Sequence, residues 1–184
     1  MKKILVAITI AMVAGMLLVA CTNGNTDQSY ANTAEMIERA QNEWIAALVS
    51  IGAAHAEGGD AEARAREVLN NYYNFHSAPV LFKPTLAFGE QTFRPDKQGA
   101  LAYFVGGDAD FPNDDGFALR PYVDGFVEMA DVFIHGDMAI AMSNITLEAY
   151  DGSTVTVDKT FGYILDEEGS LRIVTHHSSL PFAP

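Results

Sequence analysis

The second half of the chain carries four β-like runs, and this pattern constrains the fold more than any other feature. The runs cover residues 122–134, 138–149, 154–165 and 171–180. Turn signals separate them at His135-Gly136-Asp137, Asp151-Gly152 and Glu168-Gly169, and such signals are typical of β-hairpins. Consecutive hairpins form an antiparallel meander. The pattern therefore excludes a doubly wound sheet, in which strands and helices alternate.

The first half of the chain shows helical periodicity instead. Apolar side chains recur at three- and four-residue steps between Met36 and Ile51, which predicts one long amphipathic helix. Asn32 or Thr33 is the expected N-cap of this helix. Gly58-Gly59 is expected to end it.

Three shorter elements connect the long helix to the meander. Asp60 is the expected N-cap of a second helix, which Pro79 closes. A short strand is predicted over residues 80–88, at an edge or bulged because of Pro84, and a brief helix over residues 96–105. Helices followed by a meander predict an α+β fold, with the helices packed on one face of a curved sheet.

The N-terminus has the pattern of an export signal. Two lysines precede the uncharged run of residues 4–20, and this run ends at Cys21. Its length is at the low edge for spanning a hydrocarbon core of about 30 Å. Leu18-Val19-Ala20-Cys21 resembles the bacterial lipobox. The resemblance implies a signal peptide over residues 1–20 and a lipid anchor on Cys21. Residues 22–31 are polar, small and without periodicity, which predicts a flexible tether over 21–31. Residues 32–184 have the length of a single folded domain.

This interpretation implies a location in the cell envelope, on the periplasmic face. Aspartate is absent directly after Cys21, which favours the outer membrane in a Gram-negative cell. The chain has 24 acidic and 11 basic side chains and a single cysteine. These counts exclude a disulfide scaffold, a cysteine-ligated zinc site and a nucleic-acid binder that uses a basic face.

The final hairpin and one loop resemble known proteins at the residue level. The segments are Phe161-Gly162-Tyr163-Ile164, residues 171–179 and the stretch 116–121. They are similar to SnoaL-like proteins of the NTF2-like superfamily, and to the association domain of calcium/calmodulin-dependent protein kinase II and its bacterial relatives. The resemblance implies a cone-shaped pocket and a homodimer or higher homo-oligomer formed through the outer sheet face. Superfamily members include isomerases, dehydratases, cyclases and binding or assembly domains.

His176 and His177 are the first candidates for catalysis. Adjacent residues of a strand point to opposite faces, so only one imidazole is expected inside the cone. A histidine that titrates near neutral pH suits general acid or base catalysis. The alternative is a structural or interface histidine.

Arginines and tyrosines are the candidate ligand-binding residues. A guanidinium in a dry cone needs an anionic partner, either an internal carboxylate or the carboxylate of a ligand. Arg120 is the leading candidate, because an arginine of the kinase association domain lines the pocket near this place. The other candidates are Arg94, Arg172, Tyr72 and Tyr103.

Carboxylates and metal ligands give weaker signals. Asp124, Glu128 and Asp158 are possible bases, but no spacing marks any of them. The acidic loop over residues 106–116 lacks the glycine and glutamate positions of an EF-hand, so a solvated rim loop is favoured over a calcium site. No metal and no cofactor are predicted.

These features predict a lipid-anchored domain that binds a small polar or anionic organic molecule in its cone, assembles with itself, or both. The alternative is an isomerase, dehydratase or cyclase that uses an inward histidine as general acid or base. An inward histidine close to a carboxylate or tyrosine favours the enzyme, whereas a pocket dominated by arginine favours binding.

Overall fold

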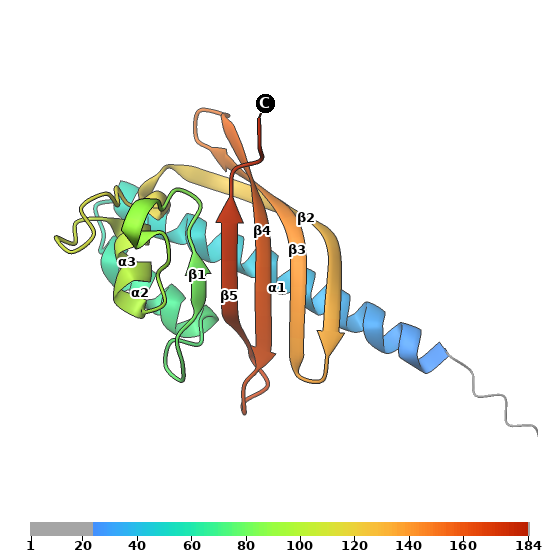
Figure 1. Cartoon of the computed structure of the whole chain (residues 1–184). Coiled ribbons are helices and arrows are strands. Elements are labelled where there is room, and N and C mark those ends of the chain that lie inside the picture. Colours follow the sequence, from blue (N-terminus) through green and yellow to red (C-terminus); the bar gives the residue numbers. More distant parts are fainter. Residues whose placement is uncertain (1–23, 184) are drawn as a thin grey trace, which may run out of the picture.

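The computed structural model describes residues 24–183 and shows helices packed against a curved sheet (Figure 1). The α-helices are α1 (Gly24–Ala56), α2 (Ala61–Tyr72) and α3 (Lys97–Val105), and short 3-10 turns lie at Gly89–Gln91 and Phe117–Leu119. The strands are β1 (Leu81–Lys83), β2 (Tyr122–His135), β3 (Met138–Ala149), β4 (Thr154–Leu165) and β5 (Leu171–Ser179). The predicted α+β class is confirmed.

The sheet has the order β1-β5-β4-β3-β2. Strands β2 to β5 form the predicted antiparallel meander, and β1 pairs with β5 in parallel. Gly136, Gly152 and Gly169 have φ values of 59°, 78° and 77° at the three hairpin turns. Such angles favour glycine, which explains why the turn signals located the strands accurately.

The predicted helix starts at Asp60 and Asp96 are confirmed, but α2 ends at Tyr72, well before Pro79, and α1 begins earlier than expected. Asp60 Oδ1 accepts a hydrogen bond from Ala63 N at 2.8 Å, and Asp96 Oδ1 accepts one from Gly99 N at 2.8 Å. Helix α1 ends before Gly58, as expected. It begins at Gly24, however, so residues 24–31 are helical where a tether was predicted. Composition misled the prediction here, because the polar segment contains no proline to stop the helix from extending backwards.

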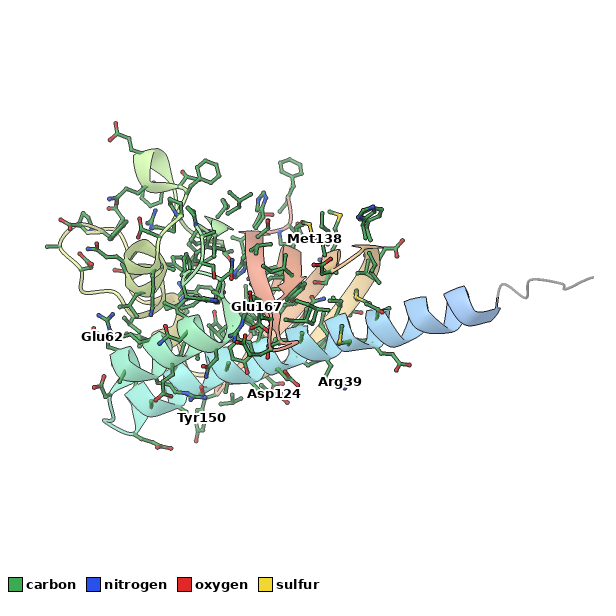
Figure 2. The ribbon with its side chains drawn as sticks, turned by 90° about the horizontal axis from the view of Figure 1, so that it is seen from below. Arg39, Glu62, Asp124, Met138, Tyr150 and Glu167 are labelled. Carbon is green, nitrogen blue, oxygen red and sulfur yellow. The ribbon has the colours of Figure 1, made fainter. Side chains whose placement is uncertain are left out.

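The helices cover a single face of the sheet. Helix α1 runs across the concave side, and its Trp44, Leu48 and Ile51 are buried there. Figure 2 shows Met138 on the side of the sheet that faces away from α1, and Arg39 on the outward side of this helix. Trp44, Tyr73, Phe82 and other large aromatic side chains fill the space between the layers. The interior of the cone is therefore mostly apolar.

The predicted signal peptide and the lipid attachment at Cys21 lie outside the described residues. Among the residues that the structure describes, no helix is both long and apolar enough to cross a membrane.

Candidate functional site

A set of polar side chains lies inside the apolar cone, on the concave face of β4 and β5. Along β5, His176 and Ser178 are buried, whereas His177 is exposed on the opposite face. On β4, Lys159 is the partner of Ser178 in the strand register, so the two side chains share the inner face. Alternation along paired strands thus brings three polar groups into the core.

Hydroxyl groups form the first cluster, near the end of β1. Thr85 Oγ1 and Ser178 Oγ are hydrogen-bonded at 2.6 Å, and both residues are buried. The Tyr103 hydroxyl interacts with the Thr85 side chain and accepts a hydrogen bond from Leu86 N at 3.3 Å. Burial raises the pKa of Tyr103 to about 12, so its phenol remains a proton donor at neutral pH. These hydroxyls form a continuous row.

The ammonium of Lys83 lies next to this row. Its Nζ donates to the carbonyl oxygen of Ser178 at 2.8 Å and to that of Thr85 at 3.3 Å. Partial burial lowers the pKa of Lys83 from its ordinary value. The carbonyl contacts hold a positive charge beside the hydroxyls, where it favours an anion.

A second chain of hydrogen bonds crosses the core from α1 to β4. Trp44 Nε1 donates to the Tyr73 hydroxyl at 2.9 Å, and this hydroxyl lies 2.9 Å from His176 Nδ1. His176 Nε2 lies 2.7 Å from Lys159 Nζ. Burial and the charge of Lys159 hold the pKa of His176 well below its ordinary value. His176 is therefore a neutral imidazole with both nitrogens engaged.

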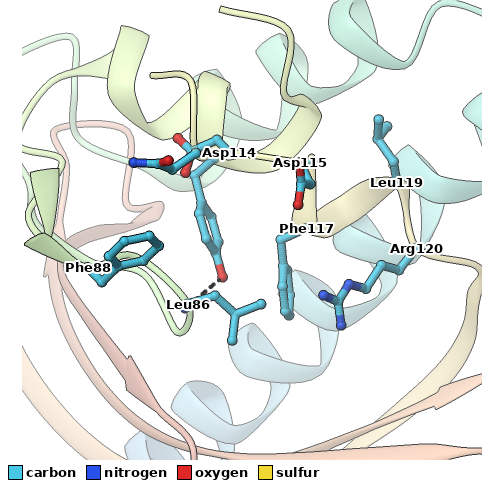
Figure 3. Close-up of a pocket in the computed structure, with 10 residues that line it drawn as sticks. Leu86, Phe88, Asp114, Asp115, Phe117, Leu119 and Arg120 are labelled. Carbon is cyan, nitrogen blue, oxygen red and sulfur yellow. Dashed lines mark hydrogen bonds between the residues drawn. The ribbon is translucent and has the colours of Figure 1, made fainter. Parts of the chain in front are cut away.

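A cavity of about 330 Å³ opens beside the hydroxyl row (Figure 3). Tyr103 and Leu86 line it on one side, and the rim segment that leads into β2 lines it on the other. The remaining lining residues are Phe88, Asn113, Asp114, Asp115, Gly116, Phe117, Leu119 and Arg120. A water molecule occupies about 30 Å³ in the liquid, so the cavity has room for water together with a small solute.

The histidine pair separates as the alternation predicts. His176 faces the cone and is 1% exposed, whereas His177 lies on the outer face. His176 has a tyrosine partner in Tyr73, the kind of neighbour that was expected to favour an enzyme. Asp124 and Glu128 are exposed, and Asp158 accepts a hydrogen bond from Asn144 Nδ2 at 2.8 Å. None of these carboxylates shares the inner face with His176.

The arginines differ in their surroundings. Arg94 is buried and forms an ion pair with Asp114 at 3.1 Å, which is the internal partner that an interior guanidinium requires. Arg120 lines the cavity but is exposed and lies over the Phe117 ring, 5.8 Å from its centroid. The expectation that Arg120 points into a dry interior is therefore wrong. Its position after the 3-10 turn at Phe117–Leu119 places it at the rim.

Tyr72 and Arg172 do not line this cavity. Arg172 Nε donates to Asp166 Oδ2 at 2.6 Å, and its Nη1 contacts the carbonyl oxygens of Asn70 and Asn71. Tyr72 lines a separate cleft between α1 and β5. Of the predicted site residues, the structure brings only Tyr103 and Arg120 to the cavity, with His176 behind it in the core.

Sequence reasoning missed Lys83, Thr85, Lys159 and Ser178. A signal for Lys159 was present, because it interrupts the inward series Val155, Val157, Phe161 and Tyr163 of β4. The described residues contain no group of three or more His, Cys, Asp or Glu side chains that could hold a metal ion.

Three comparisons relate this chain to known proteins. Residues 35–180 match the family described as metal-independent carbonic anhydrase. A protein of that name from Nostoc sp. (strain PCC 7120 / SAG 25.82 / UTEX 2576) is 46% identical over 145 residues, which cover 78% of this chain and 71% of the relative. A crystal structure of the iota-carbonic anhydrase from a cyanobacterium, complexed with bicarbonate, is 44% identical with a TM-score of 0.79, covering 80% of this chain and 92% of that one.

A more distant structure shows the likeness of fold alone. The NTF2-like superfamily protein from Salmonella enterica subsp. enterica serovar Typhimurium str. LT2 has a TM-score of 0.50 at 12% identity, covering 83% of this chain and 94% of that chain. The NTF2-like fold predicted from the final hairpin is confirmed.

Proposed function

Since the chain belongs to the metal-independent carbonic anhydrase family, we propose that it interconverts carbon dioxide and bicarbonate. The observation that carries the proposal is the row of hydroxyls beside a fixed ammonium, because the Tyr103 end of this row lines a small cavity. The relative solved with bicarbonate supports the choice of ligand.

The family match corrects the function expected from the sequence. A generic binding or assembly domain for an organic molecule is wrong, and so is the alternative of an isomerase, dehydratase or cyclase. Both expectations came from the breadth of the NTF2-like superfamily, whose fold does not determine a reaction.

The geometry suits the addition of water to carbon dioxide. In this step the water oxygen bonds to the carbon of carbon dioxide, one C=O electron pair moves onto its oxygen, and one proton of the water passes to solvent water or buffer, which leaves bicarbonate. The apolar part of the cavity wall, formed by Leu86, Phe88 and Phe117, accommodates the uncharged substrate. The hydroxyls of Thr85, Ser178 and Tyr103 supply hydrogen bonds that orient the water and the product.

Positive charge stabilises the product anion. Lys83 supplies it beside the hydroxyl row, and we propose that Arg120 supplies it at the rim of the cavity. Preorganised donors and charges act most strongly where water is excluded, which is the case at the buried Thr85–Ser178 pair.

A stopped-flow assay of carbon dioxide hydration with a pH indicator tests this function. The purified chain is expected to hydrate carbon dioxide well above the buffer rate, and bicarbonate dehydration is expected in the reverse direction. A rate equal to that of buffer in both directions would refute the proposal.

The outer face of the sheet supports a homo-oligomer. Phe126, Phe133, Ile140 and Met142 are each at least 44% exposed on the side without helices. Phe133, Ile140 and Met142 line one hollow on this face, and an exposed apolar patch of this kind marks an interaction surface. We propose that two copies of the chain pair through this face.

The location of the protein remains a proposal from the sequence alone. The run of residues 4–20 and Cys21 support export and lipid attachment at the cell envelope. Replacing Cys21 by serine and following the protein through membrane fractionation tests this, and unchanged partition would contradict it.

A further inference from the structure

Lys159 is a buried basic side chain to which the proposed reaction gives no role. It is 5% exposed, and its Nζ lies 2.7 Å from His176 Nε2 and 4.5 Å from the centroid of the Trp44 ring. Within residues 33–183, no carboxylate forms an ion pair with it. A buried ammonium without a counter-ion is strongly unfavourable.

Trp44 on α1 sets the direction of donation along the series of hydrogen bonds from α1 to β4. An indole N–H can only donate, so the Tyr73 oxygen accepts from Trp44 Nε1. The hydroxyl hydrogen of Tyr73 then needs an acceptor in the core, where water does not reach it. His176 Nδ1, at 2.9 Å, is the acceptor that faces it. Tyr73 therefore donates to Nδ1.

This direction continues through the imidazole to β4. A neutral histidine that accepts at Nδ1 carries its hydrogen on Nε2. The Nε2–H group then donates to Lys159 Nζ, and only an uncharged amine has the lone pair to accept it.

The opposite direction leaves a buried group unsatisfied. An ammonium at Lys159 would donate to Nε2, and His176 would then carry its hydrogen on Nδ1 and donate to the Tyr73 oxygen. That oxygen would accept twice, and its own hydrogen would have no acceptor among the described residues.

We propose that Lys159 acts as an uncharged amine that holds His176 in the Nε2–H tautomer, and that it is therefore a positioning residue of the cone. The consequence for turnover rests on the proposed function, whereas the tautomer does not.

The surroundings of Lys159 agree with an uncharged amine. The pKa of Lys159 is lowered to about 7, mainly by burial and to a smaller extent by the charge of Lys83 on β1. From the other elements, α1 presents the uncharged Trp44, the end of α2 presents the Tyr73 hydroxyl, and β5 presents His176. None of these side chains supplies a negative charge at neutral pH.

Protonation of Lys159 would disturb the hydroxyl row. A proton on Nζ reverses the hydrogen bonds through His176. Lys159 is paired with Ser178 in the strand register, so this reversal takes place next to the Thr85–Ser178 pair. Carbon dioxide hydration is therefore expected to fall as the pH drops through the pKa of Lys159.

Nitrogen NMR on the full chain tests the tautomer directly. At about pH 8.5, above the Lys159 pKa of about 7, the ¹⁵N shifts of His176 are expected to show hydrogen on Nε2 and a bare Nδ1. The Lys159 Nζ is expected to resonate as a neutral amine. A hydrogen on Nδ1, or an ammonium at Lys159 at this pH, would overturn the proposal without any substitution.

Two variants separate the hydrogen-bond acceptor at position 159 from a positive charge at the same position. In Lys159→Gln, the amide oxygen accepts from His176 Nε2–H and does not titrate, so the Nε2–H tautomer is expected to persist. The fall of the carbon dioxide hydration rate at acidic pH is expected to disappear. In Lys159→Arg, the permanent charge can only donate. The Nδ1–H tautomer is expected there, with activity lower by about tenfold or more, as for other partners that orient a histidine.

The outcomes distinguish this proposal from the proposed function. If the parent shows the predicted tautomer but does not hydrate carbon dioxide, the reaction is wrong and the role of Lys159 stands. If Lys159→Arg keeps both the tautomer and the pH profile of the parent, the role of Lys159 is refuted. Thermal unfolding of each variant is measured alongside, and the parent NMR result decides where a variant does not fold.

Discussion

At the scale of single residues, the proposed reaction depends on two hydroxyls that share one hydrogen bond. Replacing Ser178 by alanine removes the Oγ that lies 2.6 Å from Thr85 Oγ1. We expect kcat/KM for carbon dioxide hydration to fall about tenfold or more, because one good hydrogen bond to a charged group is worth roughly 1.5–3 kcal/mol. Stopped-flow kinetics measure it.

A matched hydroxyl pair on the outer face provides the control. Thr146 and Thr156 are hydrogen-bonded at 2.8 Å across β3 and β4. Thr156→Val is expected to leave kcat/KM unchanged. Equal losses in Thr156→Val and Ser178→Ala would show that the Ser178 effect is structural.

Arg120 tests the contribution of charge at the rim. Its guanidinium is exposed beside the cavity, so solvent screens it, and Arg120→Ala is expected to raise the KM for bicarbonate by a few-fold with little change in kcat. Arg66, exposed on α2 and paired with Glu62 at 2.6 Å, provides the comparison. A KM in Arg120→Ala equal to that in Arg66→Ala would remove Arg120 from the site.

The site was harder to predict from the sequence than the fold, for a physical reason. Strand alternation correctly separated His176 from His177. It did not locate Thr85 or Ser178, because single hydroxyls in a strand are common and their role depends on β1 lying parallel to β5. That pairing joins segments about ninety residues apart.

At the scale of elements, a buried ion pair holds the rim of the cavity. Arg94 follows β1, Asp114 lies in the loop after α3, and their side chains are 2% and 5% exposed. Asp114→Asn leaves the guanidinium without its counter-ion, so we expect the free energy of unfolding to fall by about 3 kcal/mol. Denaturant unfolding measures this loss.

The neighbouring residue is the control for Asp114. Asp115 is exposed, and Asp115→Asn is expected to change the free energy of unfolding by less than about 0.5 kcal/mol. Both residues line the cavity, so a loosened rim is expected to raise KM in Asp114→Asn alone. Equal stability of the two variants would show that the ion pair does not hold the rim.

The predicted elements were most accurate where glycine or a capping aspartate marked a boundary. The hairpin turns need positive φ at Gly136, Gly152 and Gly169, so sequence and geometry agree there. The start of α1 was missed because composition alone was used to define the segment before it. Local signals thus predict the ends of elements better than composition does.

At the scale of the whole molecule, buried titratable groups determine how stability depends on pH. Lys159 loses its proton at about 7 in the folded state but near 10.5 when unfolded. Between these values the unfolded chain binds more protons, so the free energy of unfolding rises with pH, by at most about 1.4 kcal/mol per unit. His176, with its lowered pKa, adds a rise in the acid range.

Buried tyrosines reverse this trend in strong alkali. The pKa of Tyr103 is about 12 in the folded state against 10.0 when exposed, so the folded state binds more protons above pH 10 and stability falls. Urea unfolding across this range is expected to show a maximum in the free energy of unfolding on the alkaline side of neutrality.

Lys159→Gln should flatten the rise in the free energy of unfolding above pH 7. A parent protein whose free energy of unfolding falls between pH 7 and 9 would contradict the Lys159 assignment.

The outer sheet face predicts a dimer. Replacing Ile140, 44% exposed on β3, by glutamate puts charge into the apolar patch and should yield a monomer by light scattering. Phe93→Glu, at a 71% exposed position away from the sheet, should leave the mass unchanged. A parent that is monomeric at micromolar concentration would refute the pairing.

The exchange of ¹⁸O between carbon dioxide and water, followed by mass spectrometry on the chelator-treated chain, tests the proposed reaction most directly. The purified protein is expected to deplete ¹⁸O from carbon dioxide well above the uncatalysed rate. Ser178→Ala is expected to lose most of this activity, and Thr156→Val is expected to keep it. Exchange at the uncatalysed rate in the folded parent protein would contradict the proposed reaction.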